Sequence, residues 1–296
     1  MRRNADFGLA HAPRGLVMRW PEVIFRTAYD WNGGHPMDLG LTGKRAIVLA
    51  SSRGLGRGIA EGLAAEGANV LLAARSGERL DQAVAAINAR GQGRAFAVAG
   101  DLKDSVEAIH AAAQQHLGGV DILVANTGGP PAGQATNVAP EAWAPQFDAM
   151  VVPVIRLAGL VLPGMRQGGF GRILIVASSG VEQPIPNLVM SNALRASLAG
   201  WAKTLASEVA AEGVTVNMIL PGRIETDRTG ELDAANAKAQ GKSPAEIAEA
   251  ARAAIPARRY GRVQEFADVA CFLASARASY VTGSMIRVDG GAIRSV

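Results

Sequence analysis

The sequence predicts an α/β fold in which a doubly wound parallel sheet carries helices on both faces. Two observations predict it. Short runs of apolar and β-branched residues alternate with longer, alanine-rich segments of helical spacing, and the short runs are continuously apolar. Continuous apolar strands are typical of parallel sheets that are buried on both faces. A chain of 296 residues is long enough for one such domain, and no internal repeat or second-domain linker is visible. We therefore expect a single domain.

The expected elements follow one another from Lys44 onwards. Each predicted strand is a short run dominated by Val, Ile, Leu and Ala: residues 45–50, 69–74, 94–99, 121–125, 172–177 and 213–219. Each predicted helix has apolar residues three or four positions apart: residues 55–66, 78–90, 104–117, 140–167 and 187–211. Crossovers between parallel strands are right-handed, so we expect the ligand crevice at the carboxyl ends of the strands.

Residues 1–36 stand apart from this pattern. They carry Trp20, Trp31 and several arginines without periodicity, and they lack the apolar core of a signal peptide. Met37 then opens a segment that looks like the natural beginning of the domain, which we assign to residues 37–296. We expect residues 1–36 to be a poorly ordered extension or the product of an upstream start, and an arm that bridges subunits is the alternative.

Composition and charge exclude several classes of protein. With 49% hydrophobic and 19% charged residues, the chain is globular rather than disordered. The net charge of +4 is dispersed without a long run of like charges, so we expect no nucleic-acid partner. No stretch of about eighteen uninterrupted apolar residues exists, so we expect no membrane-spanning segment. Cys271 is the only cysteine, which excludes an intramolecular disulfide and a thiolate metal cluster. Its apolar helical surroundings indicate a core residue, and we expect a reducing, cytoplasmic location and no metal.

A glycine-rich turn joins the first predicted strand to the first predicted helix. Gly54 and Gly56 allow a tight turn and close backbone approach, so amide N–H groups and the helix N-terminus can receive a pyrophosphate. Such turns often only connect elements, but this one opens a βαβ unit, which is the context that dinucleotide binding requires. The candidate cofactor-binding residues of this turn are Ser52, Arg53, Gly54, Leu55 and Gly56. The expected fold is therefore Rossmann-like.

The end of the second predicted strand indicates which dinucleotide is bound. An NAD-selective domain places an acid there for the ribose hydroxyls, whereas this chain has Arg75 after two alanines. Arg53 and Arg75 offer two cations to a 2′-phosphate, whose oxygens suit guanidinium groups. NADP(H) is therefore favoured over NAD(H), and ordinary solvated surface charge is the alternative explanation of both arginines.

From residue 38 onwards the chain resembles the short-chain dehydrogenase/reductase family, in the style of its 3-oxoacyl-(acyl-carrier-protein) reductase-like members. The glycine-rich turn matches except that Ala50 replaces the family's usual first glycine, and residues 283–291 match the family's closing strand. By this resemblance Ser178 is the catalytic serine. The resemblance also implies further cofactor contacts at Asp101, Leu102, Asn126, Gly128, Pro221, Gly222, Ile224 and Thr226.

The catalytic part departs from the family pattern. The family uses a Tyr-x-x-x-Lys pair, in which tyrosine exchanges the proton and lysine lowers its pKa and holds the nicotinamide ribose. Counting from Lys203 places this pair at Ser191 and Arg195, and the family's helix asparagine falls at Met150. Only Ser178 is retained. No tyrosine lies near these positions in the sequence, since the three tyrosines are Tyr29, Tyr260 and Tyr280.

Chemistry limits what the altered positions can do. Hydride transfer to a carbonyl builds negative charge on oxygen, which needs hydrogen-bond donors and a proton. Ser178 can donate a hydrogen bond, and Arg195 can hold the ribose and supply positive charge, but a guanidinium does not readily release a proton. Ser191 can only relay one. Glu182 is a candidate acid or a binder of a substrate amine, with an ordinary loop carboxylate as the alternative.

Two functions remain open. The first is an NADP(H)-dependent oxidoreductase that transfers a hydride to or from a small carbonyl or alcohol, or an imine, through Ser178, Ser191 and Arg195. The second is a cofactor-binding protein that has lost turnover and acts as a partner or sensor. The polar replacements favour the enzyme. We expect residues 223–258 to form a lid over the substrate. The resemblance implies a homotetramer or homodimer, with the tetramer preferred.

Overall fold

The computed structural model of the protein describes residues 37–295, so the expectations for residues 1–36 lie outside the described residues. From Leu39 onwards the chain forms one compact unit around a seven-stranded sheet of order β3-β2-β1-β4-β5-β6-β7. Every pair of neighbouring strands is parallel. The strands are β1 (Arg45–Leu49), β2 (Asn69–Ala74), β3 (Ala95–Ala99), β4 (Ile122–Asn126), β5 (Gly171–Val176), β6 (Val214–Pro221) and β7 (Met285–Val288). The predicted α/β fold is confirmed.

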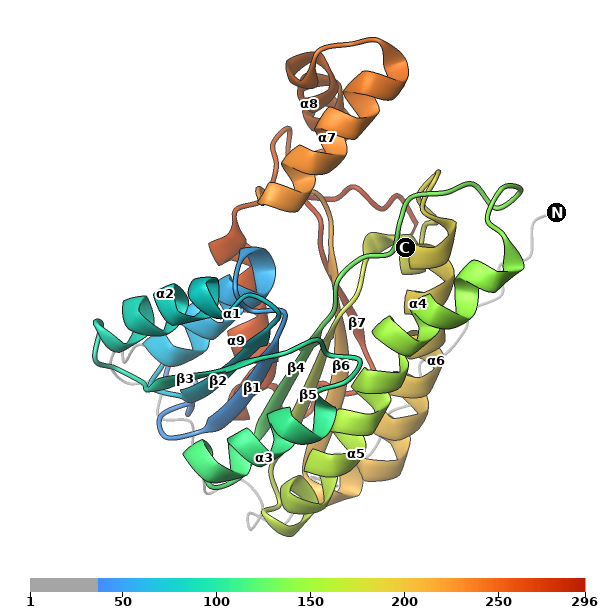
Figure 1. Cartoon of the computed structure of the whole chain (residues 1–296). Helices are drawn as coiled ribbons and strands as arrows, with labels where there is room; N and C mark the ends of the chain where they lie inside the picture. Colours follow the sequence, from blue (N-terminus) through green and yellow to red (C-terminus); the bar gives the residue numbers. More distant parts are fainter. Residues whose placement is uncertain (1–36, 296) are drawn as a thin grey trace, which may run out of the picture. The chain divides into compact units, whose positions relative to one another are not determined.

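Helices cover both faces of this sheet (Figure 1). One face carries α1 (Gly54–Ala65), α2 (Gly77–Asn88) and α9 (Val263–Ala274). The other face carries α3 (Val106–Leu117), α5 (Val152–Gln167) and α6 (Val189–Val209). Successive strand residues point to opposite faces. In β1, Val48 therefore belongs to the core cluster beneath α1, α2 and α9, whereas Ile47 and Leu49 belong to the cluster beneath α3, α5 and α6. Because both faces are buried at the centre of the sheet, the central strands are mostly apolar, whereas β7 at the edge is partly exposed and contains Arg287.

The segment predicted as one helix over 140–167 is divided. A short helix η1 (Pro140–Ala142) and α4 (Trp143–Met150) precede α5, with a break at Val151. Pro153 causes the break, because it has no N–H group to donate to the preceding turn. By length and mean hydropathy, 1.6, this segment could cross a membrane. Its apolar residues Val154, Leu157 and others are instead part of the core cluster that α3 and α6 share.

All seven parallel strands end at the same edge of the sheet, where the loops that follow them lie together (Figure 1). Two further helices, α7 (Asp227–Gln240) and α8 (Pro244–Ala254), stand beyond this edge. Because β1 lies between β2 and β4, the direction of the crossovers reverses beside it. Open α/β sheets bind their ligands at this kind of position, outside the carboxyl ends of the strands.

The segment that contains α7 and α8 is closed at its base. Glu225 N donates to Gly261 O at 2.8 Å, and Gly261 N donates to Arg223 O at 2.9 Å. Asp233 of α7 is buried, and it accepts hydrogen bonds from the Tyr260 hydroxyl at 2.8 Å and from the Arg223 guanidinium. We call Arg223, Asp233 and Tyr260 the base cluster. It makes the segment leave and rejoin the sheet edge at one point.

Candidate functional site

The turn after β1 brings the start of α1 close to the end of β4. Ala50 follows β1 with a φ of 47°, in the left-handed region that glycine adopts at no steric cost. Gly56 packs directly against it, because a Cβ on Gly56 would lie 2.5 Å from the Ala50 carbonyl oxygen. Asn126 Nδ2 donates to the same carbonyl at 3.4 Å. The structure therefore brings the predicted residues of the glycine-rich turn together with Asn126.

The N-terminus of α1 lacks a capping side chain. Its N-cap residue, Arg53, makes no side-chain cap hydrogen bond, and the first turn holds no acidic residue. The first amide groups of a helix have no partner within the helix, and their partial positive charge favours an anion. The backbone of Gly54, Leu55 and Gly56 thus offers donors at the carboxyl edge of the sheet, with half-buried Ser52 just before them.

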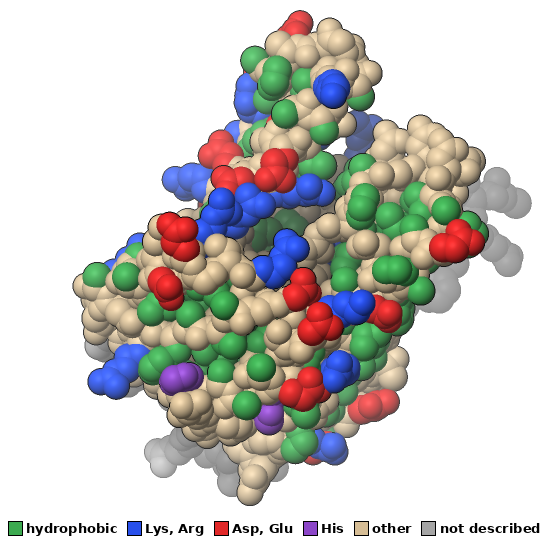
Figure 2. Space-filling model, in the orientation of Figure 1, with side chains coloured by type: hydrophobic (Ala, Val, Ile, Leu, Met, Phe, Trp, Pro, Cys, Tyr) green, Lys and Arg blue, Asp and Glu red, His purple; other side chains and the backbone are tan. Residues whose placement is uncertain are grey.

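Of the two predicted phosphate-binding arginines, one is paired and one is not. Arg75 follows β2, is exposed, and forms no hydrogen bond or ion pair with residues 37–295. Arg53 Nη1 lies 3.1 Å from Asp227 Oδ2 and 3.3 Å from Glu231 Oε1, both on α7. The hydrogen bond to Asp227 raises the pKa of Arg53. Figure 2 shows basic and acidic side chains gathered at the base of α7, beside a hollow in the surface.

The end of β3 lies next to the end of β2. Gly100 N donates to Ala74 O at 2.9 Å, which joins the two strand ends. The exposed Asp101 accepts from Lys103 N through Oδ1 at 3.1 Å, and Leu102 packs against the core. The predicted cofactor contacts Asp101 and Leu102 are therefore at the same edge as Arg75.

The residues after β6 also meet the glycine-rich turn. A Cβ on Gly222 would lie 2.6 Å from Asp289 Cα, so the segment from Pro221 rests on the chain after β7. Ile224 is buried, whereas Thr226 caps α7 by accepting from Thr229 N. The Thr226 methyl group lies 3.7 Å from the Cβ position of Gly54. Cofactor-binding candidates that are far apart in the sequence are thus in contact.

Ser178 lies where β5 ends and a short helix η2 (Ser179–Val181) begins. Its Oγ accepts from Gly180 N at 3.0 Å, so its hydroxyl proton stays available for another acceptor. A Cβ on Gly180 would lie 2.3 Å from Asn192 Oδ1, so α6 packs directly on this turn. Asn192 Nδ2 also donates to Ile185 O at 2.9 Å. Asn192 was not predicted as a site residue. It lies near the start of a helix, and the sequence does not show which loop its side chain contacts.

Arg195 is the buried cation of the site. Only 7% of its surface is exposed. Nη1 donates to Val176 O at 2.8 Å, and Nη2 lies 3.3 Å from Gly128 O and 3.5 Å from Thr127 O. Among residues 37–295 no carboxylate pairs with it. Burial lowers the pKa of Arg195 to about 10, so it stays charged at neutral pH. The guanidinium thus joins the ends of β4 and β5 through main-chain carbonyls alone.

Ser191 lies in the first turn of α6 and is half-buried. In the described part of the chain it forms no hydrogen bond with Ser178 or Arg195. Met150 is 3% exposed at the end of α4, where its side chain fills the core instead of offering the amide of an asparagine. Of the predicted catalytic residues, the structure therefore fixes Ser178 and Arg195 at the end of β5 and leaves the Ser191 hydroxyl free of both.

Of the remaining candidates, Glu182 and Tyr260 have structural partners. Glu182 forms an ion pair with Arg287, which ties the turn after Ser178 to β7. This ion pair fits the alternative interpretation of Glu182, an ordinary loop carboxylate. The Tyr260 hydroxyl donates to Asp233 in the base cluster, and Tyr280 is fully exposed. Tyr29 lies outside the described residues. Neither described tyrosine is hydrogen-bonded to Ser178 or Arg195.

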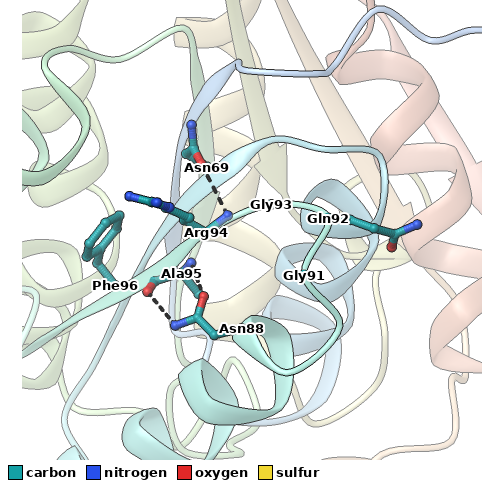
Figure 3. Close-up of a pocket in the computed structure, with 8 residues that line it drawn as sticks. All are labelled: Asn69, Asn88, Gly91, Gln92, Gly93, Arg94, Ala95 and Phe96. Atoms are coloured by element: carbon teal, nitrogen blue, oxygen red, sulfur yellow. Dashed lines mark hydrogen bonds between the residues drawn. The ribbon is translucent and has the colours of Figure 1, made fainter.

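A cavity of about 470 Å³ lies at the opposite edge of the sheet, between the end of α2 and the start of β3 (Figure 3). Asn88 bonds both backbone groups of Ala95, at 2.8 and 3.1 Å, and Asn69 Oδ1 accepts from Arg94 N at 3.1 Å. These amides hold the turn that leads into β3. The cavity is therefore a feature of that turn, and the predicted site residues lie at the other edge.

Comparison with known proteins decides the family. Residues 49–292 match the family model described as enoyl-(acyl carrier protein) reductase. The 3-oxoacyl-(acyl-carrier-protein) reductase of Vibrio cholerae is 36% identical over 255 residues, which are 86% of this chain and 98% of that protein. The chain belongs to the short-chain dehydrogenase/reductase family. Dehydrogenase/reductase SDR family member 4 of Oryctolagus cuniculus is also 36% identical, over 85% of this chain and 94% of that protein.

Solved short-chain dehydrogenase/reductase structures share the fold over most of their length. L-sorbose reductase from Gluconobacter frateurii, complexed with NADPH and L-sorbose, is 34% identical with a TM-score of 0.83, and the match covers 88% of this chain and all of that one, 100%. A variant of actinorhodin polyketide ketoreductase with NADPH is 29% identical with a TM-score of 0.80, over 85% of this chain and 98% of that one. The predicted family is confirmed.

Proposed function

We propose that this short-chain dehydrogenase/reductase is an NADP(H)-dependent oxidoreductase that transfers a hydride to or from a small carbonyl or alcohol. The observation that carries the proposal is the buried, charged Arg195, whose guanidinium donates to the Val176 carbonyl at the end of β5, two residues before Ser178. A buried cation without a carboxylate partner costs stability, so its presence at the site indicates a use for the charge. The complexes of L-sorbose reductase and of the ketoreductase with NADPH support both the cofactor and the substrate class.

The carboxyl edge fits NADP(H) in several places. The uncapped amides from Ser52 to Gly56 suit the pyrophosphate, and unpaired Arg75 suits a 2′-phosphate. Asp101 and Leu102 would hold the adenine. Among residues 37–295 nothing lies within 4 Å of a Cβ position on Gly128, which leaves space at the end of β4. The nicotinamide side would meet Asn126, Gly128, Arg195, Pro221, Gly222, Ile224 and Thr226.

The bound cofactor would supply or accept the hydride. The chain's own residues would stabilise the negative charge on the substrate oxygen and deliver its proton. Ser178 donates its free hydroxyl hydrogen to the substrate oxygen, because its lone pair already accepts from Gly180 N. Arg195 stabilises negative charge on that oxygen without releasing a proton, since its pKa of about 10 keeps it protonated. The Ser191 hydroxyl relays the proton from water. No tyrosine phenol among the described site residues can give a proton to the substrate oxygen. A substrate whose reduced form has an acidic hydroxyl group suits this site best, because its oxygen carries the negative charge more easily.

The surroundings of the site support three further proposals. Residues 223–258 form the lid, because α7 and α8 stand beyond the carboxyl edge on a closed base. Exposed Phe147 and Leu160 on α4 and α5 support a contact between subunits of a homotetramer or homodimer, with the tetramer preferred. The single buried cysteine, Cys271, supports a cytoplasmic location.

Titration with NADPH and NADH, followed by nicotinamide fluorescence, tests the cofactor. We expect tighter binding of NADPH, and we expect Arg75→Ala to weaken NADPH binding while leaving NADH binding unchanged. Exposed Arg79 lies in the first turn of α2 and is not one of the predicted cofactor-binding residues, so Arg79→Ala provides the control variant. Binding of neither nucleotide would refute the proposal.

Turnover is tested by following NADPH consumption with ketoses such as L-sorbose and with 3-oxoacyl thioesters. Ser178→Ala and Arg195→Lys should abolish or strongly reduce turnover, and Ser178→Ala should leave NADPH affinity intact. NADPH binding without consumption for any of these substrates would favour the alternative, a cofactor-binding protein without turnover. Equal turnover of Ser178→Ala and the wild type would exclude the assigned role of Ser178.

A further inference from the structure

Arg53 is bound by two acids of the helix that follows β6. Asp227 and Glu231 are separated by one helical turn of α7, so their carboxylates project from the same side of the helix. Arg53 Nη1 contacts both, at 3.1 Å and 3.3 Å. Because Arg53 is also the N-cap residue of α1, these ion pairs connect the glycine-rich turn to the proposed lid.

The two acids differ in their other partners. Glu231 Oε2 also lies 3.6 Å from Arg228 Nη1, so Glu231 shares its charge between two guanidinium groups. Asp227 pairs with Arg53 alone among the residues that the structure describes. Both acids are exposed, so they are accessible to a competing ligand. A ligand phosphate would compete with Asp227 and Glu231 for the same guanidinium.

We propose that Asp227 and Glu231 set the preference of this chain between NADPH and NADH, by competing with the 2′-phosphate for Arg53. This inference rests on the proposed NADP(H) function. Arg53 can bind the 2′-phosphate only if it leaves at least one of its two carboxylates. The acids also repel the 2′-phosphate directly, and both effects weaken the binding of NADPH more than that of NADH, which has no 2′-phosphate.

Arg75 and Arg53 therefore contribute differently. Arg75 has no ion pair or hydrogen bond with the residues that the structure describes, so it gives up none of these when it binds a phosphate. Arg53 exchanges one set of anions for another, so its net contribution is smaller than that of Arg75. The preference for NADPH in the wild type is thus lower than two arginines alone would give. Removing the acids' charge should raise it.

The experiment measures the dissociation constants of NADPH and NADH for the wild type, Asp227→Asn, Glu231→Gln and the double variant, by nicotinamide fluorescence. The ratio of the NADH constant to the NADPH constant should rise about two- to ten-fold in the double variant, the range expected for two exposed ion pairs. Asp227→Asn should account for part of this rise. The matched control is Glu249→Gln, which removes an exposed acid paired with Arg252 on α8 and should leave the ratio unchanged.

The same substitutions in an Arg53→Met background isolate the competition. There the acids have no Arg53 to bind, so neutralising them should move the ratio much less than in the wild type. An unchanged ratio in the double variant would overturn the inference, and so would an equal rise in the Arg53→Met background. If NADPH binds the wild type but the ratio does not respond, only this inference fails. If neither nucleotide binds the wild type, the proposed function fails with it.

Discussion

Single residues at the carboxyl edge hold conformations and charges that cost free energy. Ala50 adopts a φ of 47°, although alanine pays for the left-handed region in steric contact between its Cβ and the backbone. Arg195 keeps a charge in a buried place where only carbonyl dipoles offset it. Both residues connect β1, β4 and β5 at the point where the crossovers reverse. Such costs are typical of functional sites, which give up stability for a fixed geometry.

Replacing Ala50 tests the backbone cost. Ala50→Gly should raise the free energy of unfolding by about 0.5–1 kcal/mol, because relief of the left-handed strain exceeds the greater entropy of glycine in the unfolded chain. Ala50→Val should lower it by about 1–3 kcal/mol, since a β-branched side chain tolerates this conformation least. Urea denaturation of the three proteins measures both. A lower stability of Ala50→Gly would show that the strain is absent.

Replacing Arg195 tests whether its hydrogen bonds to the carbonyls outweigh the cost of burying its charge. Arg195→Met removes the desolvation cost but leaves the carbonyls of Val176, Thr127 and Gly128 without their donor. We expect the loss of hydrogen bonds to dominate, with a destabilisation of about 2–4 kcal/mol. Arg195→Lys keeps the charge and one bond and should lose about 1–2 kcal/mol. Chemical denaturation gives both values, and a stabilised methionine variant would mean that the buried charge dominates.

At the scale of elements, sequence periodicity predicted the strands and most helices because burial of apolar faces determines both. It failed at 140–167, where a proline inside an apolar run breaks the helix without changing the apolar pattern. It also gave no indication of the base cluster. Arg223, Asp233 and Tyr260 are polar residues at unrelated spacings, and they meet only because the chain folds back on itself between them.

The start of α9 carries a pH-dependent contact beside that base. Glu265 accepts from both Nη atoms of Arg259 at 2.7 Å and from Arg262 N at 2.8 Å. These bonds, with the Arg259 bond first, lower the pKa of Glu265 from 4.5 to about 2. A carboxylate whose pKa is lowered by folding stabilises the folded state above its ordinary pKa, and this contribution is lost as the pH falls toward the lowered value.

Glu265→Gln should therefore have a lower Tm than the wild type at neutral pH. The difference in Tm should shrink as the pH falls from about 4.5 and should be absent near pH 2. Thermal unfolding between these pH values measures it. Glu249→Gln, which removes an exposed acid paired with Arg252 within the same helix, should show no comparable pH dependence. A Tm difference that is independent of pH would contradict the assignment.

At the scale of the whole molecule, the parallel sheet explains why the position of the site was predictable and its catalytic details were not. Parallel strands end at one edge of the sheet. The fold class alone therefore predicts that the residues after β1, β2, β4, β5 and β6 lie at that edge. Contacts between loops and helices were out of reach. Nothing in the sequence pairs Arg53 with Asp227, which lie far apart in the chain, or shows that Arg195 has carbonyls as its partners.

The packing of α9 against α1 makes the single cysteine a probe of the folded state. Cys271 is buried between α9 and α1, where its Sγ lies 3.0 Å from the Cβ position of Gly62, and burial raises the pKa of its thiol to about 12. At pH 8 the thiol should react with an aromatic disulfide reagent at least about 100-fold more slowly in the folded protein than in urea. Stopped-flow absorbance measures both rates. Fast reaction of the folded protein would place Cys271 at the surface.

The closed base of α7 and α8 has a consequence for how this chain can diversify. Arg223 and Gly261 are joined by backbone hydrogen bonds, so everything between them is an insertion whose two ends already touch. Changing the length of such an insertion costs only the slowly growing entropy of loop closure, and the register of the sheet is not disturbed. The part of the segment beyond Asp233 can therefore change in length without altering the strands, the base cluster or the predicted cofactor contacts Ile224 and Thr226.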